Sequence, residues 1–71
     1  MRYAIVIERG PTSYGAYVPD LPGCVAAAET REEALDLIRE AIRFHLEEMQ
    51  QEGLVVPEPS SSAEYVEVAT A

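Results

Sequence analysis

The sequence contains little of what catalysis, metal binding or membrane insertion requires. It has one cysteine and one histidine, so it cannot close an intramolecular disulfide and offers no Cys/His cluster for a structural metal. No apolar run approaches the roughly 18 residues of a membrane span, and no charged-then-apolar leader opens the chain. P-loop, GxGxxG, HExxH and CxxC motifs are also absent. These absences predict a soluble cytoplasmic protein with no cofactor, no metal site and no membrane contact.

The chain is short, with 71 residues, and we expect a single domain over residues 1–71. A chain of this size buries only roughly 60% of the surface that its unfolded state exposes. Its core therefore supplies a few kcal/mol of net stability at most, and small domains often add an oligomer interface. With no disulfide or metal available, self-association into a homodimer or larger assembly is the expected supplement.

The negative charge is concentrated in one part of the chain. Residues 1–28 are neutral overall, whereas residues 29–71 hold eleven acids against three arginines and carry the whole net charge of −8. An acidic surface repels phosphate backbones, so the composition disfavours nucleic-acid binding. The charge would suit a basic protein partner, although an acidic balance also simply aids solubility.

Hydrophobic periodicity predicts an α+β fold with the element order β-β-β-α-β. We expect strands over residues 2–9, 14–18, 24–29 and 64–69, and a helix between Thr30 and Gly53, with a flexible connector over 58–64. Consecutive strands usually pair, which gives an antiparallel sheet of three to four strands. The apolar stripe of the helix must then cover one face of that sheet. The stripe consists of Ala34, Leu35, Ile38, Ala41, Ile42, His45, Leu46 and Met49.

The stretch "PDLPGC" stands between the second and third strands. Proline cannot donate to a ladder and glycine tolerates positive φ, so Pro19, Asp20, Pro22 and Gly23 are predicted to form a structural turn. Asp20 is expected to accept a hydrogen bond from a backbone N–H in this turn. Cys24 is interpreted as a small buried hydrophobe, because a nucleophile would need a histidine and an orienting group nearby.

The helix carries two further features. Thr30 and Glu33 fit a capping box at its N-terminus. Leu37 and Phe44 lie beyond the apolar stripe and widen the apolar arc to more than one sheet face requires. We interpret them as a candidate oligomer or partner interface, the alternative being a core that curls around the helix.

The strand "YAIVIE" and the run from Tyr17 to Ala34 together resemble the HicB-like antitoxin family. The carrying motifs are an aromatic second strand, P-D-L-P-G-C, a small-residue strand and a T-x-E-E-A helix start. The resemblance implies a partial ribonuclease-H-like fold that sequesters a small basic HicA toxin, an mRNA interferase with a double-stranded-RNA-binding-like fold. Many members of the family add a C-terminal DNA-binding domain. This sequence ends directly after the predicted fourth strand, so no direct DNA binding is expected.

Ribonuclease-H chemistry uses clustered carboxylates around two metal ions, and the first two strands offer only Glu8, so no catalytic residues are predicted. Three classes of function remain open at this point. The favoured one is an antitoxin-like module that neutralises a HicA-type interferase by occluding its RNA site. The second is a stand-alone homo-oligomer of unassigned role, and the third is a metal-dependent nuclease.

Overall fold

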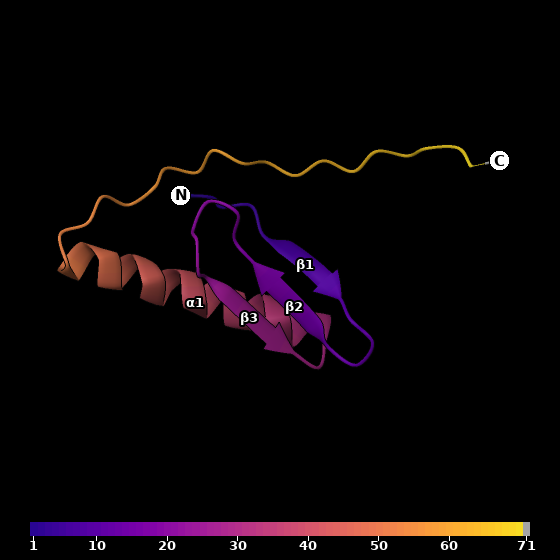
Figure 1. The fold of residues 1–71 in the computed structure, drawn as a ribbon, viewed down its shortest axis with the longest axis horizontal. Helices are drawn as coiled ribbons and strands as arrows, with labels where there is room; N and C mark the ends of the chain where they lie inside the picture. Colours follow the sequence, from indigo (N-terminus) through magenta and orange to yellow (C-terminus); the bar gives the residue numbers. More distant parts are fainter. Residues whose placement is uncertain (71) are drawn as a thin grey trace.

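Residues 1–70 are described by a computed structural model, which contains one antiparallel sheet and one helix (Figure 1). The elements are β1 (Val6–Arg9), β2 (Tyr14–Tyr17), β3 (Val25–Ala28) and α1 (Arg31–Gln51). The strand order in the sheet is β1-β2-β3, and α1 packs against one face of it. The predicted α+β class is confirmed, with three antiparallel strands followed by one covering helix.

Strand register decides which side chains face the helix. Ile7, Ala16 and Ala26 pair across the three strands, whereas Val6, Tyr17 and Val25 form the neighbouring row. Adjacent residues of a strand point to opposite faces. The row through Ala16 therefore meets α1, and the row through Val25 faces outward, as the burial of Ala16 and the exposure of Val25 indicate.

β1 begins at Val6, later in the chain than the predicted start at residue 2. The register pairs Val6 with Tyr17, the last residue of β2. Continuing this ladder would place residues 2–5 opposite Val18 and the corner that follows it. Pro19 has no N–H to donate and the chain turns there, so residues 2–5 have no partner strand among the described residues.

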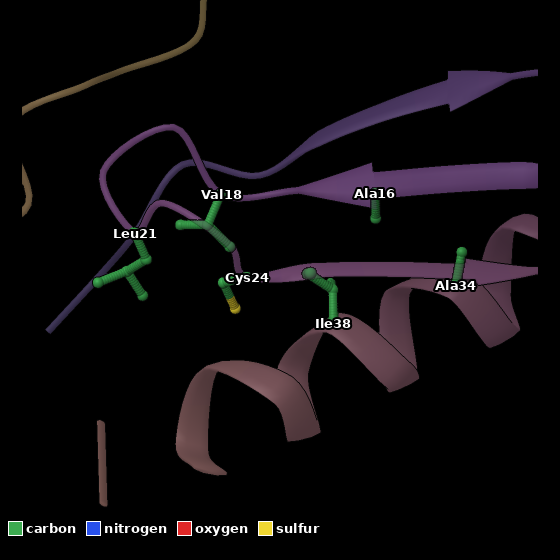
Figure 2. Packing of buried hydrophobic residues seen from close by; sticks show 6 residues of the cluster. All are labelled: Ala16, Val18, Leu21, Cys24, Ala34 and Ile38. Atoms are coloured by element: carbon green, nitrogen blue, oxygen red, sulfur yellow. The ribbon is translucent and has the colours of Figure 1, made fainter. Parts of the chain in front are cut away.

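The core is built from small and medium side chains at the junction of sheet, corner and helix (Figure 2). Leu21 and Ile38 are its largest fully buried members. Small residues at the helix–sheet contact let the helix approach the sheet closely, and close packing then leaves little room for larger ones. The six buried residues are Ala16, Val18, Leu21, Cys24, Ala34 and Ile38.

Both ends of α1 have well-defined caps. Thr30 is extended and its hydroxyl accepts a hydrogen bond from the N–H of Glu33 at 3.1 Å. At the other end, Gly53 has φ +71°, and its N–H donates to the carbonyl of Gln50. The N–H of Leu54 donates to the carbonyl of Met49 at 2.9 Å. This pair of bonds is a Schellman motif, which requires the positive φ that glycine adopts without strain.

The C-terminal segment corrects one expectation. Residues 64–69 were predicted as a strand, but residues 54–70 form no ladder in the described structure. Figure 1 shows this segment doubling back from the end of α1, passing the N-terminus and continuing beyond it. The alternating sequence alone cannot form a strand, because backbone N–H and C=O groups need a neighbouring edge to pair with. Residues 61–63 line one hollow with residues 2–4 but form no ladder with them. We call residues 62–70 the tail.

Candidate protein-binding surface

One flank of α1, beside the face that covers the sheet, carries two exposed apolar side chains. Leu37 is 48% exposed and Phe44 is 69% exposed, whereas Ala34 and Ile38 on the inner face are fully buried. Leu37 and Phe44 are seven residues apart, which is about 10 Å along a helix axis. The core therefore does not curl around the helix to cover them, and they stand on the outer surface.

Carboxylates surround these two residues unevenly. Asp36 pairs with Arg39 at 3.7 Å and Glu40 pairs with Arg43 at 3.0 Å, so the middle of the outer face is locally compensated. All four side chains are well exposed, and such pairs contribute little to stability. Their effect is that two of the three arginines of the helix region are already paired with carboxylates of the same helix.

The last two turns of α1 have no such compensation. Glu47 and Glu48 form no ion pair with any described residue, and no basic residue lies in the last turn. They border a shallow surface depression together with Phe44 and Gln51. The C-terminal end of a helix is the negative end of its dipole, where cations are favoured and carboxylates are not. Phe44, Glu47, Glu48 and Gln51 thus form an apolar centre with an unsatisfied acidic rim, which we call the acidic patch.

The "PDLPGC" corner closes on itself through backbone hydrogen bonds. The N–H of Val18 donates to the carbonyl of Cys24 at 3.2 Å, and the N–H of Cys24 donates to the carbonyl of Leu21 at 3.1 Å. Gly23 has φ +83°, a left-handed conformation that a side chain with Cβ disfavours. The corner thereby buries the Leu21 side chain in the core, so it is built into the packing of the domain.

Asp20 makes its contacts far along the chain instead of within its own turn. Its carboxylate accepts hydrogen bonds from the N–H groups of Ser60 and Ser61, both at 2.9 Å. It also accepts from their hydroxyls at 3.1 and 2.7 Å. These donors favour the charged form and lower the pKa of Asp20 to about 2. We call this arrangement the clasp.

A second contact beside the clasp joins the hydroxyl of Tyr3 to the carbonyl of Pro57, to which it donates a hydrogen bond. Partial burial, then the nearby carboxylates of Glu58 and Asp20, raise the pKa of Tyr3. The sequence did not predict the clasp, because residues 58–64 were interpreted as a flexible connector. Two sequence features could have indicated the clasp: a carboxylate in a rigid corner, and a run of serines that can each donate two hydrogen bonds, one from the N–H and one from the hydroxyl.

The described residues offer little for nucleophilic or metal chemistry. Cys24 is only 3% exposed, and burial raises the pKa of its thiol, which keeps it protonated and unreactive. Within residues 1–70 no three side chains of His, Cys, Asp or Glu gather closely enough to hold a metal ion. α1 is also too polar over its length to cross a membrane.

Comparison with known proteins identifies the family. Residues 3–70 match the model of a HicB-like antitoxin of bacterial toxin–antitoxin systems. Among curated relatives, antitoxin HicB 2 of Photorhabdus laumondii is 32% identical over 69 residues, which is 96% of this chain and 50% of that protein. A UPF0150 protein of Thermoplasma acidophilum is 36% identical over 58 residues, covering 80% of this chain and 84% of that one.

A phage protein and a solved structure are also similar to this chain. An uncharacterised 14.9 kDa protein of Haemophilus phage HP1 is 38% identical over 93% of this chain, which again spans only 50% of the relative. A chain in the solved HicA3 and HicB3 toxin–antitoxin complex superposes with a TM-score of 0.71 at 30% identity. That match covers 84% of this chain and 70% of the solved one. This chain belongs to the HicB-like antitoxin family of bacterial toxin–antitoxin systems.

Proposed function

We propose that this protein is a cytoplasmic antitoxin that binds a small basic HicA-type mRNA interferase, occludes its RNA site and has no catalytic activity of its own. The proposal depends chiefly on the acidic patch, where Phe44 is exposed beside two uncompensated glutamates. Proteins that bind RNA present cationic groups to its phosphates. Carboxylates held on a rigid helix can occupy those cationic groups and so exclude the RNA.

The apolar and acidic parts of the surface have separate roles in this account. Leu37 and Phe44 supply the desolvated centre of the interface, which usually carries most of the binding energy. Glu47 and Glu48 supply a rim that steers a basic partner and raises its association rate. Partner cations would also relieve the unfavourable charge at the end of the helix dipole. Binding should therefore weaken as salt increases but not vanish.

The solved relative supports the choice of partner class. Its description is of a HicA3 and HicB3 toxin–antitoxin complex, and a TM-score of 0.71 places most of this chain on the same fold. HicA-type toxins are therefore the first partners to test.

A stand-alone homo-oligomer of unassigned role, with no toxin partner, is the second candidate. Its supporting observation is the same exposed pair, Leu37 and Phe44, which fits a second copy as readily as a toxin. A neighbouring gene for a short, arginine- and lysine-rich protein with one histidine favours the antitoxin, and the absence of such a gene favours the oligomer.

Co-expression with a HicA-type toxin encoded beside this chain tests the proposal directly. We expect growth to be rescued and the two proteins to co-purify, and Phe44→Glu to abolish both effects. Val25→Glu is the matched control, because Val25 is similarly exposed, at 65%, but lies on the open face of the sheet. Loss of rescue in the Val25 variant with rescue kept in the Phe44 variant would move the interface to the sheet. Failure of rescue and of complex formation with the unmodified protein would leave the stand-alone oligomer as the better account.

A further inference from the structure

The hollow in the acidic patch is bordered by three kinds of chemical group. Its lining residues are Phe44, Glu47, Glu48 and Gln51. The last three follow Phe44 by three, four and seven residues, and this spacing places all four side chains on one flank of α1. An aromatic ring, two carboxylates and a side-chain amide therefore meet in one depression, and the Phe44 side chain is largely exposed to solvent.

The two carboxylates are not neutralised by the arginines of the same helix. Arg43 precedes Glu47 by four residues, a spacing at which ion pairs form along a helix. Its guanidinium instead contacts both carboxylate oxygens of Glu40, at 3.0 and 3.4 Å. Arg39 is likewise paired with Asp36. Neither arginine lines the hollow, so its carboxylates are available to a cation from another molecule.

The position of the hollow on the helix also favours a cation. The hollow lies in the last two turns of α1, at the negative end of the helix dipole, and no basic residue is present in the last turn. The face of an aromatic ring carries partial negative charge and attracts cations as well. The Phe44 ring, the carboxylates and the dipole thus all favour a positively charged ligand.

Arginine fits this combination of groups better than lysine does. A guanidinium is planar and weakly hydrated, so it can stack on the Phe44 ring. Its five N–H donors can bond a carboxylate through two parallel hydrogen bonds, and the side-chain oxygen of Gln51 can accept another. A lysine ammonium is a compact, strongly hydrated charge, so it can approach the carboxylates but gains little from the ring.

We propose that the hollow is a binding site for one arginine side chain of the partner, stacked on Phe44 and hydrogen-bonded to Glu47 or Glu48. The inference rests on the proposed function for the identity of the partner, a basic toxin. It adds that this toxin presents an arginine, and not merely positive charge, to the end of α1. An arginine bound there is withdrawn from the phosphates of RNA.

Two blocked tripeptides, Ala-Arg-Ala and Ala-Lys-Ala, test the hollow without any toxin. Each is titrated into the protein at constant low ionic strength, while NMR follows the ring signals of Phe44 and the side-chain amide of Gln51. We expect the arginine peptide to shift both sets of signals saturably, with about fivefold higher affinity than the lysine peptide, because only the guanidinium gains from the ring.

Variants of the lining residues assign the contacts. Phe44→Leu keeps an apolar side chain but removes the ring, so it should abolish the preference for arginine. Glu47→Gln with Glu48→Gln should weaken both peptides, because the carboxylates attract either cation. Glu52→Gln is the matched control, since Glu52 lines a neighbouring hollow but not this one, and it should preserve the preference.

Equal affinity of the two peptides for the unmodified protein would overturn the proposal, because the patch would then read charge alone. The absence of a saturable shift with either peptide would overturn it too. A preference for arginine that survives Phe44→Leu would contradict stacking on the ring.

The toxin complex tests the same contact in its proposed setting. Each exposed arginine of a HicA-type toxin is replaced by lysine in turn, and binding is measured to the unmodified protein and to Phe44→Leu. We expect one arginine to lose about fivefold or more in affinity with the unmodified protein, and much less with Phe44→Leu. If the toxin binds but no arginine behaves in this way, the inference is wrong and the proposed function stands. If no toxin binds while the peptide preference remains, the proposed function fails and the arginine site stands.

Discussion

Asp20 and Ser61 lie 41 residues apart in the chain, yet two hydrogen bonds join them: the carboxylate accepts from the N–H of Ser61 at 2.9 Å and from its hydroxyl at 2.7 Å. Ser60 contributes another such pair. One carboxylate in a rigid corner thereby holds Ser60 and Ser61 in place. We expect the charge state of that carboxylate to decide whether these two serines stay at the corner.

Asp20→Asn should release the tail without unfolding the domain. The amide oxygen accepts more weakly than a carboxylate, and it presents an NH₂ group to donors that need acceptors. We expect the ¹⁵N relaxation of Ser60 and Ser61 to become that of a mobile chain, while residues of β2 and β3 keep their order. Glu58→Gln removes a nearby charge that accepts no hydrogen bond from these serines, and it should leave Ser60 and Ser61 ordered.

The clasp should also respond to acid. Hydrogen bonding lowers the pKa of Asp20 from 3.8 to about 2, so the folded state favours the carboxylate relative to the unfolded chain. Its stabilising effect is fully present above pH 4 and is lost as pH falls from about 4 through 2. The amide shifts of Ser60 and Ser61 should therefore titrate together with a midpoint near pH 2. A midpoint near 4 would contradict the clasp.

Gly23→Val should destabilise the fold through the backbone alone. Gly23 has φ +83°, and a Cβ added there would meet no atom within 4 Å, so the cost arises from the left-handed conformation and not from a clash. We expect a loss of about 1 kcal/mol or more in the free energy of unfolding, measured by urea denaturation. Gly15→Ala is the control, because Gly15 lies in β2 without positive φ and its added Cβ would only touch the carbonyl of Ala26 at 4.0 Å. An unchanged melting temperature for Gly23→Val combined with lost partner binding would make the corner a recognition element.

Cys24 should behave as a packing residue. Cys24→Ser places a hydroxyl among the apolar side chains of the core. A buried hydroxyl without a hydrogen-bond partner should cost about 1–3 kcal/mol of unfolding free energy. Cys24→Ala removes only the sulfur and should cost less. The unmodified thiol should react with an alkylating reagent only as fast as the domain opens, so its rate should rise with urea. Rapid labelling in the absence of urea would mean that Cys24 is accessible.

Substitution at the end of α1 should separate stability from binding. Glu47→Lys with Glu48→Lys places cations where the helix dipole favours them, and should raise the melting temperature of the isolated protein modestly. The same change should weaken binding of a basic toxin by tenfold or more and reverse its salt dependence. A matched pair, Glu8→Lys with Glu29→Lys, alters the net charge equally but lies away from the acidic patch, and should leave most of the affinity intact. Equal losses in the two pairs would mean that only total charge matters.

The local parts of the fold could be predicted from sequence, and the long-range parts could not. Alternation in residues 3–7, the small residues from Cys24 to Ala28 and the spacing of Ala34 and Ile38 give the strands, the helix and their contacting faces. These features depend on residues near one another in the chain. The clasp depends on a contact between positions 20 and 61, and periodicity carries no information about such a pairing.

The tail illustrates the same limit from the other direction. Its alternating sequence predicts a strand correctly as a preference, but a strand also needs an edge beside it. The sequence pattern indicates which conformation residues 64–69 favour, but it does not indicate which element they contact. The start of β1 at Val6 has the same origin, because the ladder stops where Pro19 turns the opposite chain away.

The small side chains between α1 and the sheet have a consequence for how this protein can diversify. Ala16 and Ala34 leave so little space that the inner face of the helix tolerates hardly any enlargement. Leu37 and Phe44 are exposed and lie outside the core cluster of residues 1–70, so they can be exchanged without repacking the interior. A lineage can thus retarget the surface of α1 toward a different partner while the scaffold stays the same, and duplicated copies can drift apart in specificity without first losing their fold.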